Sequence, residues 1–151
     1  MVPNELFMTS KTMTETTNDT PGATTNPEGL AKALLSAQAA IDKKAENVKL
    51  LDLSEISGFT DYFLICSGTS DRQVQAIGEA VSSALEVEGF ELLSSEGIQD
   101  GRWVLMDFGD VIVHVFLDAL REYYDLENLW KDAPKVAIPA AFYGEGASRL
   151  N

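Results

Sequence analysis

Three aspartates carry the side chains most suited to metal chemistry: Asp61, Asp107 and Asp110. Carboxylate oxygens are the ligands that Mg²⁺ prefers in proteins. Asp107 and Asp110, however, straddle a short turn, and Asp61 lies far from both in the sequence. Solvated surface carboxylates explain this pattern more simply. We therefore predict that the chain holds no metal.

Cys66 and His114 could form a nucleophile and its base by residue type alone. Cys66 ends the apolar run Tyr62–Cys66, and a cysteine inside a buried strand is usually inert core. One histidine and one cysteine also cannot build a structural zinc site. The string Asp107-Phe108-Gly109 matches a kinase motif by chance, because no Gly-rich phosphate loop accompanies it. We therefore predict no catalytic residue, no cofactor and no enzymatic activity.

A predicted hairpin near the end of the chain sorts its side chains onto two faces. Gly109-Asp110 suits a two-residue loop between strands over 102–108 and 111–117, which sets Trp103 opposite Phe116 and Leu105 opposite His114. One face is wholly apolar and should lie under the helices: Val104, Met106, Phe108, Val111, Val113, Val115 and Leu117. The other face carries Trp103, Leu105, Asp107, Ile112, His114 and Phe116.

This second face is the candidate site, and two interpretations of it remain open. It is either a second core layer beneath the C-terminal helix, with His114 hydrogen-bonded inside, or a surface for a partner. Large aromatic side chains with a few placed polar groups are typical interface anchors. On the second interpretation, we expect these residues to bind the partner: Trp103, Leu105, Asp107, His114, Tyr123 and Tyr124.

The helices and strands expected to position these residues indicate an α/β fold, with a mixed sheet of about five strands packed with helices. Asn26-Pro27 should cap a first helix, and Ser70 with Gln73 should cap a second that ends at Gly89. A third helix is expected over 120–130, capped by Asp118 or Asp125. The remaining strands are predicted over 48–53, 62–66 and 90–93.

The composition indicates the extent of the compact domain and the kind of partner it binds. The compact part is predicted over 27–136, between a disordered Thr-rich tail at 1–26 and a flexible tail at 137–151. With 24 Asp and Glu against 11 Lys and Arg, the net charge is −13, which favours a basic partner over direct, sequence-specific nucleic-acid binding. A single cysteine and the absence of an apolar run of about 18–20 residues favour a cytoplasmic protein without membrane contact.

Five strings together closely resemble the ribosomal silencing factor family, also called Iojap or RsfS. Each string alone is modest evidence, but their joint order and spacing are specific, and they span about residues 30–136: Asp42–Ala45, Thr60–Phe63, Ser67–Val74, Gly101–Phe116 and Tyr123–Trp130. The resemblance implies a fold similar to nucleotidyltransferases, although family members are not known to act as such.

The resemblance also implies a function and a basic partner. Family members bind the large ribosomal subunit through its protein L-fourteen, block association with the small subunit and repress translation when nutrients are short. The Trp103 face is then expected to dock on that protein. Two alternatives remain: a divergent metal-dependent nucleotidyltransferase that uses Asp61, Asp107 or Asp110, and a homodimer of the free protein through the Trp103 face.

Overall fold

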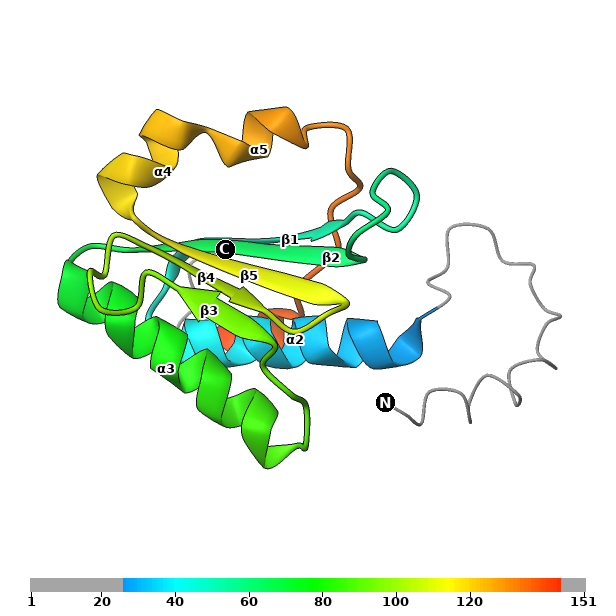
Figure 1. The fold of residues 1–151 in the computed structure, drawn as a ribbon, viewed down its shortest axis with the longest axis horizontal. Coiled ribbons are helices and arrows are strands. Elements are labelled where there is room, and N and C mark those ends of the chain that lie inside the picture. Colours follow the sequence, from blue (N-terminus) through cyan, green and yellow to red (C-terminus); the bar gives the residue numbers. More distant parts are fainter. Residues whose placement is uncertain (1–25, 145–151) are drawn as a thin grey trace, which may run out of the picture.

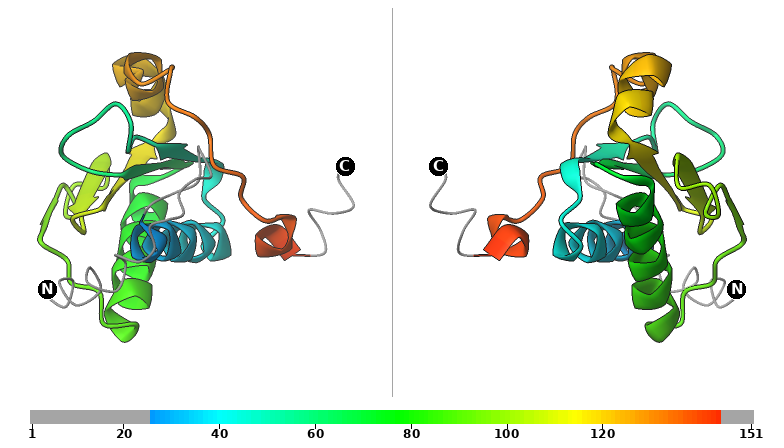
Figure 2. Two further views of the ribbon diagram at one scale, coloured as in Figure 1. Left: turned by 90° about the vertical axis from the view of Figure 1, so that its right-hand side faces the viewer. Right: turned by 90° about the vertical axis from the view of Figure 1, so that its left-hand side faces the viewer.

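The computed structural model describes residues 26–144, and these form one five-stranded mixed sheet with helices on both faces (Figure 1). The sheet order is β1-β2-β5-β4-β3, in which β2 and β5 are parallel and the other neighbours antiparallel. Helices α2 and α3 lie against one face, and α4 and α5 lie over the other, as the side views also show (Figure 1 and Figure 2). The predicted α/β class and strand number are confirmed.

The elements follow the chain in this order: α2 (Pro27–Asp42), β1 (Glu46–Asp52), β2 (Tyr62–Gly68), α3 (Asp71–Val87), β3 (Ser94–Glu96), β4 (Trp103–Asp107), β5 (Val111–Leu117), α4 (Asp118–Tyr124), α5 (Leu126–Leu129) and the 3₁₀ helix η2 (Ala140–Tyr143). No helix among residues 26–144 is long and apolar enough to cross a membrane.

The two long helices begin where their capping residues predict. The Asn26 side chain accepts a hydrogen bond from the Gly29 amide at 2.9 Å, with Pro27 in the first helical position. The Ser70 side chain accepts from the Gln73 amide at 3.1 Å. The Gln73 side-chain oxygen accepts a hydrogen bond from the Thr69 amide at 2.7 Å. The capping box therefore extends one residue further than predicted.

The hairpin β4–β5 has the predicted register. Trp103 pairs with Phe116, Leu105 with His114, and Asp107 with Ile112. Gly109 takes a φ of 94°, which the first loop position of a type II′ turn requires and which favours glycine. The register therefore fixes which side chains of both strands face α2 and α3.

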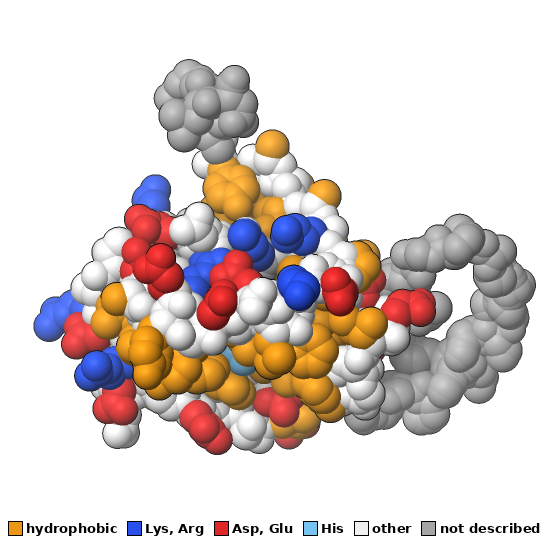
Figure 3. All heavy atoms as spheres, turned by 90° about the horizontal axis from the view of Figure 1, so that it is seen from above, with side chains coloured by type: hydrophobic (Ala, Val, Ile, Leu, Met, Phe, Trp, Pro, Cys, Tyr) orange, Lys and Arg blue, Asp and Glu red, His pale blue; other side chains and the backbone are white. Residues whose placement is uncertain are grey.

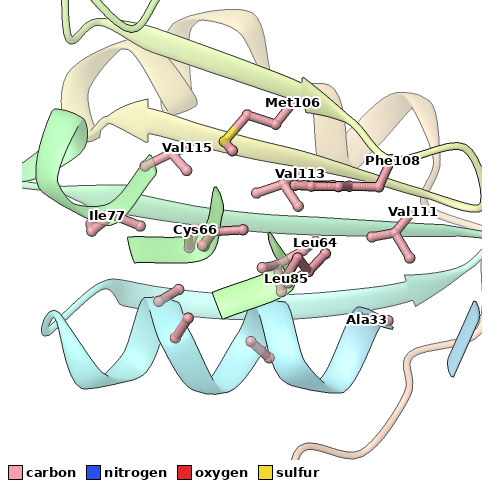
Figure 4. Close-up of a cluster of buried hydrophobic side chains, with 14 of the residues drawn as sticks. Ala33, Leu64, Cys66, Ile77, Leu85, Met106, Phe108, Val111, Val113 and Val115 are labelled. Atoms are coloured by element: carbon pink, nitrogen blue, oxygen red, sulfur yellow. The ribbon is translucent and has the colours of Figure 1, made fainter. Parts of the chain in front are cut away.

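The main core lies between the sheet and the two long helices (Figure 4). From the sheet it takes the apolar face of the hairpin together with Leu64 and Cys66 of β2, and from the helices Ala33, Ile77 and Leu85. Every residue of β2 is buried, as its continuous apolar run predicts for a strand covered on both faces. Each large side chain buried in this way contributes about 1.5–3 kcal/mol to folding.

Two predicted elements are wrong in position. The third strand is β3 at Ser94–Glu96, a fully exposed edge strand, and not 90–93. Phe90 instead donates its amide to the Leu85 carbonyl at 2.9 Å, which closes the end of α3. The helix predicted over 120–130 is two helices, because Asp125 adopts a left-handed conformation with φ 51°. Neither Asp118 nor Asp125 makes a side-chain cap hydrogen bond.

The structure describes only part of each of the two predicted tails. The tail at 1–26 lies outside the described residues except for Asn26, which caps α2. The flexibility of 137–151 stays a prediction, and residues 145–151 lie outside the described part. Before them, the Val136 amide donates to the Leu50 carbonyl at 2.8 Å, and Ile138 packs against the main core.

Candidate functional site

The sheet face opposite α2 and α3 carries the residues that the sequence singled out. We call it the aromatic face; it is formed by Trp103 and Leu105 of β4, His114 of β5, Phe63 of β2, Tyr124 of α4, and Phe59 and Trp130 beside them. Figure 3 shows a band of hydrophobic atoms on this side, with the single histidine within it and both acidic and basic side chains around it.

The face combines a buried layer with side chains that are open to solvent, and its role as a partner surface stays a prediction. Its floor is a second, smaller core of buried residues under α4 and α5: Leu51, Leu53, Phe63, Ile65, Phe116 and Ala133. Above that floor, Trp103, Leu105 and Asp107 are half-buried. Tyr123 and Tyr124 are 77% and 51% exposed. The face is thus a core layer whose outer side chains remain open to solvent.

The aromatic rings touch one another across the whole face. Trp103 stacks on Phe116 with ring centroids 4.8 Å apart and contacts Tyr124 at 4.9 Å. Phe63 contacts His114 at 4.6 Å and Trp130 at 5.7 Å. Aromatic pairs at such distances contribute about 0.5–1.5 kcal/mol beyond the area they bury. These contacts restrain the inner rings of the face, Phe63, Trp103 and His114, which therefore lose little entropy when a partner binds.

Sequence reasoning missed one end of the face. In the loop between β1 and β2, Ile56 and Phe59 are 47% and 59% exposed, and Phe59 contacts Trp130 at 6.1 Å. Phe63 joins the face because β2 pairs in parallel with β5, which places Phe63 beside Ile112. The sequence shows the continuous apolar run of β2, but it does not show that β5 is the neighbour of β2 in the sheet.

His114 is the most buried of the predicted partner-binding residues, with 4% of its surface exposed. Its Nδ1 accepts a hydrogen bond from the Trp103 Nε1–H at 3.2 Å. Burial lowers the pKa of His114 from 6.5 to about 4, because the charged imidazolium would lose its hydration among aromatic rings. His114 is therefore neutral near neutral pH and acts through hydrogen bonds.

Asp107 shapes the hairpin turn beside the face. Its Oδ1 accepts a hydrogen bond from the Gly109 amide at 2.8 Å, which holds the residue in place at the end of β4. The side chain is half-buried and forms no ion pair within the described part of the chain. It therefore offers a negative charge on the same side of β4 as Leu105 and Trp103.

A buried arginine holds α4 and α5 over the sheet. Arg121 Nε and Nη2 donate to the two carboxylate oxygens of Glu127 at 2.9 and 3.1 Å, and Nη1 donates to the Ser67 hydroxyl at 2.8 Å. The hydrogen bonds from Arg121 lower the pKa of Glu127, which Lys49 also approaches at 3.3 Å. This cluster joins α4, α5 and β2, and so positions Tyr123 and Tyr124.

The carboxylates considered for metal chemistry have other partners. The Asn26 amide donates to Asp61 at 2.7 Å and to Asp110 at 3.1 Å, and Lys32 forms an ion pair with Asp110 at 2.8 Å. Asp107 takes part in the turn instead. Across residues 26–144, no three His, Cys, Asp or Glu side chains are grouped so that they could hold a metal ion.

Cys66 is fully buried, and that burial raises its pKa from 9.0 to about 12. A thiol that stays protonated is a poor nucleophile. The sequence prediction placed Cys66 in a buried strand, and β2 confirms that placement.

The fold and this face define a small α/β protein organised around an exposed aromatic surface. The sequence profile of the family described as "Ribosomal silencing factor during starvation" matches residues 25–149. The chain therefore belongs to the RsfS family of ribosomal silencing factors, as its sequence strings predict.

Three relatives illustrate the similarity. The chain is 49% identical over 100 residues to the ribosomal silencing factor RsfS of Bacillus subtilis, covering 66% of this chain and 85% of that protein. A crystal structure of a Chromobacterium violaceum protein matches with a TM-score of 0.67 and 37% identity, covering 76% of this chain and 96% of that one. The mouse protein named "Mitochondrial assembly of ribosomal large subunit protein 1" is 31% identical over 91 residues, covering 58% of this chain and 40% of that protein.

Proposed function

We propose that this chain binds the large ribosomal subunit through its protein L-fourteen and sterically blocks association with the small subunit. Translation is repressed because the bound protein occupies the surface on which the subunits join. The observation that carries the proposal is the exposed aromatic face in a chain of the ribosomal silencing factor family. The RsfS resemblance supplies the partner, and the mouse relative's name refers to a mitochondrial large ribosomal subunit.

The chemistry of the face suits a basic protein partner. Trp103 is half-buried between Phe116 and Tyr124, so it is a preformed apolar anchor of the kind that dominates interface energies. Leu105 and the two tyrosines extend the apolar contact, and Asp107 supplies a negative charge at its edge. The net charge of −13 attracts a basic partner before contact and raises the association rate.

We propose a binding role without catalysis, cofactor or metal. The Asn26 and Lys32 contacts on Asp61 and Asp110 give those carboxylates a structural explanation, and the raised pKa of Cys66 disfavours a nucleophilic role. Mg²⁺ and nucleotides should therefore leave the melting temperature unchanged. A bound ligand at a hundredfold excess over its Kd would stabilise the protein by about 2.7 kcal/mol, which a thermal melt detects readily.

The same face offers a surface for a second copy of the chain. A homodimer of the free protein would cover Trp103 and compete with ribosome binding. We propose that both processes take place in the cytoplasm. Sedimentation of the free protein over a range of concentrations measures this association, and the Trp103→Ala variant should weaken it.

The proposal is tested by co-sedimentation with separated ribosomal subunits on sucrose gradients. The protein should migrate with the large subunit and not with the small subunit. Trp103→Ala and Asp107→Lys should each lose this co-migration while retaining the wild-type circular dichroism spectrum. Val87→Ala is the matched control, because Val87 is 81% exposed on α3, which packs on the opposite face of the sheet. Co-migration of a folded Trp103→Ala protein at wild-type affinity would rule out this face.

A further inference from the structure

His114 has a defined tautomer in the aromatic face. Its Nδ1 accepts the hydrogen bond from Trp103 Nε1, so Nδ1 carries no proton. The ring is neutral near neutral pH, as its lowered pKa of about 4 indicates. The single imidazole proton therefore resides on Nε2, and Nε2–H is a hydrogen-bond donor.

That donor has no acceptor within residues 26–144. The ring contacts around His114 come from Phe63, Trp103 and Phe116, whose side chains contain no acceptor oxygen. A contact between N–H and an aromatic ring is weaker than a hydrogen bond to oxygen. A buried donor without an acceptor is uncommon and costly in proteins. The position of this donor, in the middle of the proposed docking face, calls for an explanation.

We infer that the partner places a carbonyl oxygen against the His114 Nε2–H when it docks on the aromatic face. The inference rests on the proposed function and adds a specific contact to it. His114 then has two roles: Nδ1 holds the Trp103 indole, and Nε2–H recognises the partner. A partner that presents an apolar group or a donor at this point would leave Nε2–H unpaired and bind less tightly.

The partner's oxygen can reach Nε2 with a small adjustment of the face. The imidazole is visible at the surface in the hydrophobic band of Figure 3, although only 4% of the residue is exposed. Phe59 packs on Phe63, which contacts the His114 ring, and Phe59 is 59% exposed, so its side chain has room to change rotamer. Such rotamer changes are common when protein surfaces associate.

Two substitutions separate the two roles of His114. In His114→Asn, the amide oxygen can occupy the place of Nδ1 and still accept from Trp103, but no donor remains at the Nε2 position. In His114→Gln, the longer amide can place a donor near Nε2 and gives up the acceptor at Nδ1. Thermal melts and circular dichroism establish first that both variants fold.

Binding to purified large ribosomal subunits is then measured for both variants and for the Val87→Ala control. His114→Asn should bind at least about tenfold more weakly than the wild type, because the partner's carbonyl loses its donor. His114→Gln should bind more tightly than His114→Asn. A folded His114→Asn protein that binds like the wild type would overturn the inference.

Nuclear magnetic resonance gives an independent measurement on the unmodified chain. The chain has one histidine, so a sample labelled with ¹⁵N-histidine reports on His114 alone. We expect an Nε2–H tautomer in the free protein, and a downfield shift with slower exchange of that proton when purified protein L-fourteen is added. If L-fourteen binds and the signal stays unchanged, the inference falls while the proposed function stands. If the wild type binds neither L-fourteen nor the large subunit, both fall.

Discussion

At the scale of single residues, the neutral state of His114 makes folding stability depend on pH. Burial lowers the pKa of His114 from 6.5 to about 4, so the unfolded chain binds more protons than the folded one between these values. Stability is therefore fully present above about pH 6.5 and falls as the pH drops through this range. Between about pH 7 and about pH 5, the loss should be about 2 kcal/mol.

Urea denaturation of the wild type and of His114→Phe at these two pH values checks this dependence. The phenylalanine variant should lose most of the pH dependence, since it has no group to protonate. Glu127 has a lowered pKa, so its contribution to stability is lost only when the pH falls below the range in which His114 is protonated. Equal pH dependence in both proteins would show that His114 is not the group responsible.

The Cys66 thiol should react slowly in the native protein. It is fully buried in β2 and its pKa is raised to about 12, so both access and the thiolate fraction are small. Labelling with a thiol reagent at neutral pH should proceed only as fast as the protein opens, and quickly once denaturant is added. Rapid labelling of the native protein would contradict the burial of β2.

At the scale of secondary-structure elements, the cluster around Arg121 should control the position of α4 and α5. Arg121→Met removes the hydrogen bonds to Glu127 and Ser67 and leaves the Glu127 carboxylate with Lys49 alone. Glu127 is partly exposed and keeps Lys49, so the loss should be that of hydrogen bonds to a charged group, about 1.5–3 kcal/mol. We expect a lower melting temperature and weaker ribosome binding at temperatures where the variant is still folded.

A double-mutant cycle of Arg121→Met with Glu127→Gln isolates the pair itself. The effects of the two substitutions on the free energy of unfolding should be clearly less than additive, because each removes the same interaction. Additive effects would mean that Arg121 acts through its other partners, the Ser67 hydroxyl and the Glu46 carbonyl. Normal binding by a folded Arg121→Met protein would show that the cluster stabilises α4 and α5 without positioning the tyrosines.

The elements differ in how far the sequence could predict them. The β4–β5 register was predictable, because a two-residue loop and strict alternation leave one pairing. The parallel pairing of β2 with β5 was not, since nothing local specifies the neighbour of a fully apolar strand. The break at Asp125 was also hidden, because it depends on a left-handed conformation within an otherwise helical pattern.

The same limits apply to the candidate site. Trp103, Leu105, Asp107 and His114 were placed on one face by alternation along β4 and β5. Phe59 and Phe63 were missed because they reach the face through tertiary pairing and a loop. The hydrogen bond between Trp103 and His114 depends on side-chain geometry that strand pairing alone does not give.

At the scale of the whole molecule, the first 25 residues should be dispensable for folding and for ribosome binding. They are rich in Thr and show no apolar periodicity, so their sequence offers little to a core. A protein that starts at Asn26 keeps the cap of α2. Its melting temperature should lie within a few degrees of the full chain, and its affinity for the large subunit should be unchanged. A larger drop in either would assign the segment a role.

The central claim is that the aromatic face blocks subunit joining, and a joining assay with purified subunits tests it most directly. Large subunits are incubated with the protein, small subunits are added at a Mg²⁺ concentration that favours joining, and joined ribosomes are measured by light scattering. The wild type and Val87→Ala should reduce joining in proportion to the large subunits they occupy, and a folded Trp103→Ala protein should leave joining at the level without protein. Undiminished joining with saturating wild-type protein, or full inhibition by Trp103→Ala, would contradict the account.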